Sequence, residues 1–176
     1  MLLLGQLGDL LFLFCTTVRH DDEMQVHHTS RRSEEIMDTA GNKDVVRQLY
    51  TLINQRRVEQ ATDLIAPDYQ EHDPLPGQGS GREGAIDRFS MITTGLAPHF
   101  TVEDLIAEGD RVVVRWTNAG THVGDFAGIP ATGRTFTIAG IDIYRLAGGQ
   151  LREHWHVIDQ LGMLGQLGLL PQGAAT

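Results

Sequence analysis

The order of two hydrophobic periodicities along the chain constrains its fold most. Before Pro98 the apolar residues keep helical spacing, and after it they alternate every second residue. Helices followed by a run of consecutive strands indicate an α+β domain with an antiparallel meander. We therefore expect a curved antiparallel sheet with N-terminal helices packed on its concave side.

Three helices are expected in the first half of the folded part. The first carries apolar residues over 45–53 with Asn42 as its N-cap, the second is short and stops before Pro67, and the third covers about Arg82 to Thr94. Residues 68–81 are rich in Gly and Pro and are expected to form a loop. This loop contains Tyr69, His72 and Asp73.

Four strands are expected after Pro98, followed by a Leu-rich helical tail. A tight turn at Gly148 and Gly149 joins the last two strands. The expected strands are Phe100–Ala107, Arg111–His122, Thr135–Leu146 and Leu151–Ile158.

The first forty residues differ from the rest. Leu2–Phe14 is apolar but too short and interrupted to span a bilayer, and the first basic residue, Arg19, comes too late for a secretory signal. Polar residues without a period follow, and Met37 is an alternative start. We expect a cytoplasmic protein with a disordered or loosely packed extension over residues 1–40, a folded domain over 41–171 and a tail over 172–176.

Charge and cysteine content exclude several classes of partner. The formal net charge is −9 and the pI is about 5.2, which argues against nucleic acid and anionic membranes. A single cysteine, Cys15, excludes an internal disulfide framework and a Cys-rich zinc site. We expect a small-molecule substrate, with no nucleic-acid or membrane partner.

The last strand places two carboxylates on an apolar face. Strict alternation puts Glu153 and Asp159 in phase with Leu151, Trp155 and Val157. Burial raises the pKa of a carboxyl group, because it disfavours the charged form. The group then stays partly protonated, as a general acid/base requires. The alternative is that both groups lie at strand ends, where they cap neighbours or face water.

The opposite face of this strand carries Arg152, His154 and His156. The His-x-His spacing places both rings on one side of the strand, which suits a metal site. Because we expect the Arg152 side to face outward, we expect no metal there.

The strand Thr135–Leu146 is apolar on both faces. One face carries Phe136, Ile138 and Tyr144 together with Asp142, and the other carries Ala139, Ile141 and Ile143. The helices can cover only one side of the sheet, so a second subunit is the simplest cover for the other. We expect a homodimer or a higher homo-oligomer.

Alternation also predicts which side chains face the hollow beneath the helices. An Asp inside a strand, such as Asp142, is unfavourable unless it has a partner or a purpose. His122 can face the hollow or serve as a satisfied core histidine. The expected lining is Trp116, Phe136, Tyr144 and Trp155, with His122, Asp142 and Asp159 as the convergent polar groups.

Four segments together resemble the SnoaL-like polyketide cyclases, also called ester cyclases. The segments are YQEHDP (Tyr69–Pro74), GTHVGDFAGIPATGR (Gly120–Arg134), GIDIYR (Gly140–Arg145) and LREHWHVIDQLGMLGQLG (Leu151–Gly168). The resemblance covers about residues 42–171. It implies the cone-shaped α+β fold shared with nuclear transport factor 2, scytalone dehydratase and ketosteroid isomerase.

The resemblance also implies a chemistry. In such cyclases an Asp at the position matching Asp159 is the acid/base of an intramolecular aldol ring closure, without a metal or other cofactor. The position matching Asp142 is a His in those cyclases, so the chain departs from them there. We predict Asp159 and Asp142 as catalytic residues. The predicted substrate-binding residues are His72, His122, Trp116, Tyr69, Phe126, Tyr144, Glu153 and Trp155.

Other functions remain open on the same fold. A hydrolase of the epoxide-hydrolase type would activate water between Asp142 and Asp159, with Arg134 or Arg145 turned inward. A dehydratase or isomerase, a non-catalytic small-molecule-binding module and an accessory partner in hydroxylation are further alternatives.

Overall fold

The computed structural model describes residues 39–170 of the chain. Its first helix covers residues 39–54, and the helices η1 (Val58–Leu64, a 3-10 helix), α2 (Gly81–Leu96) and α3 (Gln160–Leu167) follow. The strands are β1 (Ile65–Glu71), β2 (His99–Glu108), β3 (Arg111–Thr121), β4 (Thr135–Ala147) and β5 (Gln150–Ile158).

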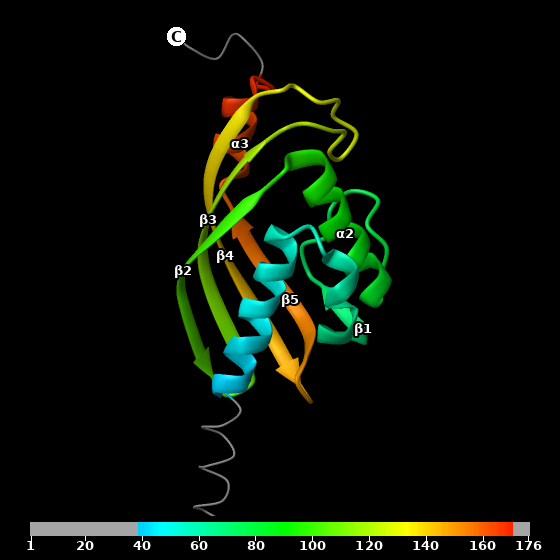
Figure 1. The fold of residues 1–176 in the computed structure, drawn as a ribbon, viewed down its shortest axis with the longest axis vertical. Coiled ribbons are helices and arrows are strands. Elements are labelled where there is room, and N and C mark those ends of the chain that lie inside the picture. Colours follow the sequence, from blue (N-terminus) through cyan, green and yellow to red (C-terminus); the bar gives the residue numbers. More distant parts are fainter. Residues whose placement is uncertain (1–38, 171–176) are drawn as a thin grey trace, which may run out of the picture. The chain divides into compact units, whose positions relative to one another are not determined.

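These strands form a five-stranded sheet in the order β1-β5-β4-β3-β2. Strands β2 to β5 make the expected antiparallel meander, whereas β1 pairs in parallel with β5. The first helix and α2 lie across one side of the curved sheet (Figure 1). The predicted α+β class and the placement of the helices are therefore confirmed.

Strand β1 lies where the sequence analysis expected the end of the second helix and the start of the following loop, so this expectation is wrong. Its parallel pairing with β5 places Gln70 opposite Glu153 and Glu71 opposite His154. The register is irregular between Ile65 and Gln70, where Pro67 lacks a backbone donor. An edge strand that contains Pro is ordered by its distant partner, and local periodicity does not reveal it.

The inner faces of the first helix, β3 and β4 form the core. The helix buries residues at the expected spacing, and Asn42 is a buried residue inside the helix instead of its N-cap. In β3 and β4 every second side chain is buried, as predicted. The core residues of these three elements include Val46, Leu49, Tyr50, Ile53, Val112, Val114, Trp116, Phe136, Ile138, Tyr144 and Leu146.

A bulge in β5 reverses the predicted faces of that strand. Leu146 pairs with Leu151 but Arg145 pairs with Glu153, which leaves Arg152 as an extra residue. One extra residue moves all later side chains to the other face. His154 is therefore buried, and Val157 is 76% exposed.

The remaining predictions on the chain's organisation have mixed outcomes. Residues 39 and 40, expected in the extension, are helical. The other expectations for the extension and the tail concern residues 1–38 and 171–176, which lie outside the described residues. Within residues 39–170, no helix is long and apolar enough to cross a membrane.

Candidate active site

A cavity of about 510 Å³ lies between the helices and the inner face of the sheet. Its apolar wall comes from all these elements and includes Ile53, Phe89, Ile92, Leu96, Phe100, Trp116, Phe126, Ile138, Ile158 and Met163. The polar side chains on its wall are Tyr50, Asp73, Arg88, Asn118, Asp142, Tyr144, His154, His156 and Gln160. An apolar pocket with a few convergent polar groups is typical of a small-molecule site.

Asp142 lies on the inner face of β4, at the cavity wall, as predicted. Its Oδ2 accepts hydrogen bonds from the hydroxyls of Tyr50 and of Tyr144, the latter over 3.3 Å. Its Oδ1 lies 3.6 Å from Nε2 of His154. These contacts explain how a strand interior accommodates a carboxylate.

The surroundings of Asp142 keep it ionised. Burial by itself raises its pKa, but the positive charge of His154, with Nε2 3.6 Å from Oδ1, and the Tyr50 hydroxyl outweigh burial. The pKa of Asp142 therefore falls below its ordinary value, and the group is a carboxylate at neutral pH.

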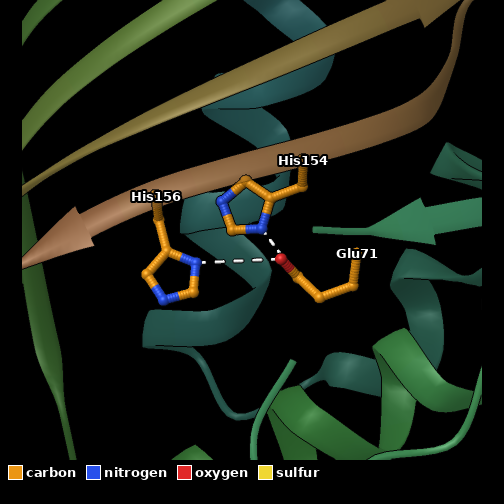
Figure 2. A group of neighbouring side chains, drawn as sticks. All are labelled: Glu71, His154 and His156. Carbon is orange, nitrogen blue, oxygen red and sulfur yellow. Dashed lines mark hydrogen bonds and ion pairs between the residues drawn. The ribbon is translucent and has the colours of Figure 1, made fainter. Parts of the chain in front are cut away.

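His154 projects inward from β5 between two carboxylates. Its Nδ1 lies 2.8 Å from Oε2 of Glu71 (Figure 2), and its Nε2 faces Asp142. Burial lowers the pKa of the imidazole, but the Asp142 and Glu71 carboxylates raise it to about 9. His154 is therefore an imidazolium at neutral pH.

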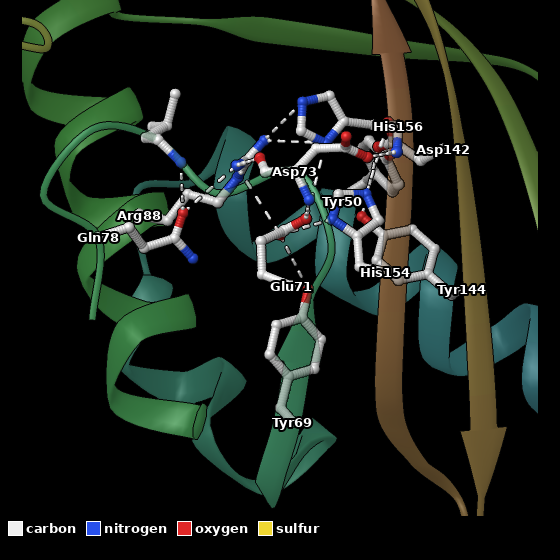
Figure 3. Close-up of polar contacts among 11 residues, drawn as sticks. Tyr50, Tyr69, Glu71, Asp73, Gln78, Arg88, Asp142, Tyr144, His154 and His156 are labelled. Atoms are coloured by element: carbon white, nitrogen blue, oxygen red, sulfur yellow. Dashed lines mark hydrogen bonds and ion pairs between the residues drawn. The ribbon is translucent and has the colours of Figure 1, made fainter. Parts of the chain in front are cut away.

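Glu71 and Arg88 continue the network away from Asp142 (Figure 3). Arg88 Nη1 lies 3.8 Å from Oε2 of Glu71 and donates to the carbonyl of Asp73 over 3.3 Å. Burial raises the pKa of Glu71, but the two histidines and Arg88 lower it well below its usual range. Both carboxylates beside His154 therefore carry charge.

His156 is the inward neighbour of His154 on β5 and lines the cavity. Both of its ring nitrogens lie 3.5 Å from Nη2 of Arg88, and Nδ1 lies 3.7 Å from Oε1 of Glu71. Its backbone N–H donates to Asp73 over 3.1 Å. Arg88 and Glu71 thus fix the ring at the cavity wall.

Glu71, His154 and His156 offer three ligand-type atoms within 4.8 Å of one another, shown in Figure 2. Two imidazoles and a carboxylate are a donor set that several transition metals accept. The histidines face inward, so the expectation that they face solvent is wrong. However, the Arg88 guanidinium contacts two of the three groups, and the two ring nitrogens of His154 each face a carboxylate that favours the imidazolium. We therefore assign the trio to an ion-pair network.

Asp159 does not face the cavity, which contradicts its predicted orientation. It is the exposed N-cap of α3, and its Oδ1 accepts a hydrogen bond from the Gly162 N–H over 2.8 Å. The bulge at Arg152 is the physical reason. The alternative that Asp159 caps a neighbouring element agrees with this geometry.

His72, Glu153 and Trp155 also lie away from the cavity, on the outer face of the sheet. His72 bonds Glu153 over 2.9 Å and stacks on Trp155 with ring centroids 4.3 Å apart. Arg145 Nε donates to Glu153 over 2.5 Å, so Arg145 points outward as well. The structure does not bring these predicted residues to the cavity.

The other predicted residues divide into two groups. Trp116, Phe126 and Tyr144 line the cavity as expected. Tyr69 is buried beside Glu71, with its hydroxyl 3.4 Å from Oε2, and His122 is a core histidine whose Nδ1 lies 3.2 Å from Thr132 Oγ1. Neither residue is among those that line the cavity.

The predictions from the sequence did not include five residues of the network, although the sequence has features that point to them. Arg88 occurs at helical spacing with the inward residues of α2, and Glu71 belongs to the segment YQEHDP. The His-x-His pair was assigned to the wrong face. The residues missed are Tyr50, Glu71, Arg88, His154 and His156.

A curved α+β sheet whose helices enclose an apolar cavity with a few charged groups at its wall is typical of proteins that bind or convert small molecules. The family model described as SnoaL-like polyketide cyclase matches residues 43–167. The chain belongs to the SnoaL-like polyketide cyclase family.

Curated relatives and solved structures agree with this membership. The chain is 30% identical over 137 residues to the aklanonic acid methyl ester cyclase DauD of Streptomyces sp. (strain C5), covering 71% of this chain and 80% of DauD. It is 26% identical over 123 residues to the nogalonic acid methyl ester cyclase of Streptomyces nogalater, covering 68% and 92%. TsrD of Streptomyces laurentii has 30% identity and a TM-score of 0.69, covering 76% of this chain and 98% of TsrD.

Proposed function

We propose that this chain is a cofactor-independent cyclase that closes a ring by an intramolecular aldol reaction, with Asp142 as the base. The observation that carries the proposal is the ionised Asp142 carboxylate at the wall of a largely apolar cavity. The expected rise in the pKa of a buried carboxylate does not occur here, because His154 and Tyr50 outweigh burial, and the group is in the ionised form that takes a proton.

The reaction needs no co-reactant. Asp142 takes a proton from a substrate carbon made acidic by flanking carbonyls, and an enolate forms. The enolate carbon attacks a second carbonyl of the same molecule, which forms the new C–C bond and leaves an alkoxide. Protonated Asp142 then returns its proton to that oxygen, so the product is an isomer of the substrate.

The cavity supports this chemistry in two ways. Its apolar wall holds the substrate in a folded conformation in which the reacting carbons meet. Binding in this conformation lowers the entropic part of the activation barrier that the same reaction has in solution. Burial, with the nearby Asp142 charge, raises the pKa values of Tyr50 and Tyr144 well above the ordinary value. Both hydroxyls therefore stay protonated. Each donates its proton to Asp142, and once Asp142 has taken up the substrate proton a hydroxyl can turn to donate to the enolate oxygen.

The relatives indicate the substrate class to test. Two of them are named for the methyl esters of aklanonic and nogalonic acid. We propose a substrate of this class, a polyketide ester. The apolar wall of the cavity supports this choice, because aromatic and aliphatic side chains contact such a carbon skeleton favourably.

The test is incubation of the purified protein with each methyl ester, followed by chromatography and mass spectrometry. A cyclase produces a new species of unchanged mass, whose new C–C bond NMR distinguishes from other isomers. Ester hydrolysis releases methanol and leaves the acid lighter by one CH2, epoxide opening adds one water, and a dehydratase removes one. Binding without turnover would indicate a binding or accessory module. Asp142→Asn should abolish ring closure, and Asp159→Asn, at the exposed cap, should retain it. Full activity of Asp142→Asn would overturn the proposal.

A further inference from the structure

We propose that Glu71 is a positioning residue that controls Asp142 through His154, so that two carboxylates and one imidazole respond to pH as one unit. The inference rests on the proposed role of Asp142 as the base. Glu71 is not among the residues that line the cavity, so it acts on the substrate only through its neighbours.

The contact geometry supports a relay. His154 bridges the two carboxylates, with Nδ1 2.8 Å from Oε2 of Glu71 and Nε2 3.6 Å from Oδ1 of Asp142. The side chains of Glu71, His154 and Asp142 are only 5%, 3% and 10% exposed. Because water screens such buried groups weakly, a change of charge at one end reaches the other.

The sheet fixes the orientation of the relay. Parallel pairing places Glu71 opposite His154, and antiparallel pairing places His154 opposite Tyr144. The Tyr144 ring stacks on His154 with centroids 4.5 Å apart and planes 11° apart. This stack holds the imidazole with one nitrogen toward each carboxylate.

Every element around His154 contributes a titratable or charged group. These groups are Tyr50 from the first helix, Tyr69 and Glu71 from β1, Arg88 from α2, Asp142 and Tyr144 from β4, and His156 from β5. Of these, Glu71 and Asp142 are the carboxylates that face the two ring nitrogens of His154.

Removing the charge of Glu71 therefore has a defined effect. The imidazolium of His154 loses one of its two ionised partners, so its pKa falls by about 1 to 3 units. The imidazolium of His154 is therefore lost at a lower pH in Glu71→Gln, and the alkaline limb of the pH–rate profile of ring closure moves to lower pH with it. The acidic limb, where Asp142 takes up a proton, should not move to higher pH, because His154 is still an imidazolium there.

The first experiment compares Glu71→Gln with the wild-type protein. The His154 ring is titrated by ¹⁵N NMR, and kcat and kcat/KM are measured against pH. The matched control is Glu153→Gln, because Glu153 also pairs with a histidine, His72, but on the outer face. The control should change neither the His154 titration nor the alkaline limb.

A second set of variants separates a relay from simple destabilisation. In a His154→Gln background, adding Glu71→Gln should leave the alkaline limb where His154→Gln puts it. Asp142→Asn should also lower the pKa of His154, and this readout requires no turnover. It applies even if Glu71→Gln fails to fold, and an unchanged His154 pKa in Asp142→Asn would refute the relay.

The outcomes distinguish this inference from the proposed function. An unchanged His154 pKa in folded Glu71→Gln, or a lower kcat with the same pH profile, would overturn the relay. Absence of ring closure in the wild-type protein would overturn the proposed function instead. The NMR titration would still decide whether Glu71 and Asp142 are coupled through His154.

Discussion

Asp142 on β4 and His156 on β5 are directly opposed across the two strands, and both side chains line the cavity. Opposed residues on one face of an antiparallel pair have Cβ atoms about 5 Å apart. A substrate group at this point of the wall can therefore meet the carboxylate and the imidazole together.

This relationship predicts a role for His156 in turnover. His156→Gln should lower kcat/KM for ring closure by about 10-fold or more. The imidazole can hydrogen-bond a substrate oxygen and exchange a proton with it, whereas the Gln amide can form only the hydrogen bond. The change is measured by steady-state kinetics.

The control for His156 is Glu59→Gln, since Glu59 is an exposed residue of η1 that does not line the cavity. The control should keep its kinetics, and the melting temperatures of both variants should stay close to that of the wild-type protein. Unaltered kinetics in His156→Gln would remove this residue from the mechanism.

The sequence allowed β3 and β4 to be placed correctly because neither has an irregularity in its pairing with the other. Strict alternation therefore put Asp142 at the cavity. In β5 one extra residue, Arg152, inverts the faces, and no local pattern marked it. Glu71 was missed because β1 depends on pairing with β5, a contact between residues distant in the sequence.

The buried ion pairs predict how stability depends on pH. The pKa of His154 is raised from 6.5 to about 9, so its contribution to the free energy of unfolding is complete below 6.5 and is lost as pH rises through 9. The pKa of Glu71 is lowered from 4.5, so its contribution is complete above 4.5 and is lost on acidification. The melting temperature should therefore be highest at mildly acidic pH, between 4.5 and 6.5.

Calorimetry across this pH range tests the assignment. The alkaline fall in melting temperature between pH 6.5 and 9 should be smaller in His154→Gln than in the wild-type protein, because this variant has no imidazole to deprotonate there. An equal alkaline fall in both proteins would mean that another group causes it.

The cavity wall predicts a packing-sensitive glycine. A Cβ at Gly140 would lie 2.2 Å from Cζ2 of Trp116, a cavity residue. Gly140→Ala must displace this ring, at a cost of about 1–3 kcal/mol in the free energy of unfolding. Chemical denaturation measures the loss, and KM should rise as the wall changes shape. Gly109→Ala has open space around its Cβ but a φ of +55°, so it should lower stability through backbone strain without raising KM.

The ion-pair assignment of Glu71, His154 and His156 predicts indifference to metal. Adding Zn²⁺ at a small molar excess should leave the ¹⁵N resonances of both histidines unchanged near neutral pH, because Arg88 and the His154 proton neutralise the carboxylate. Arg88→Ala removes this competitor and should make the trio responsive to Zn²⁺. Tight Zn²⁺ binding by the wild-type protein would show that the trio is a metal centre.

The outer face of the sheet predicts self-association. Ile141 is 45% exposed and pairs with Val157, which is 76% exposed, so the two form adjoining apolar side chains on the face opposite the cavity. Such a patch is typical of an interface, and we expect a homodimer that buries it.

Ile143→Glu should yield a monomer by light scattering, because Ile143 lies on the same outer face, two residues from Ile141, and the change places a charge beside the patch. Thr135→Glu, at an exposed position of the same strand, should remain dimeric. Asp142→Asn should alter ligand binding and leave assembly intact, since it lies on the inner face. A dimer that survives Ile143→Glu would move the interface to another surface.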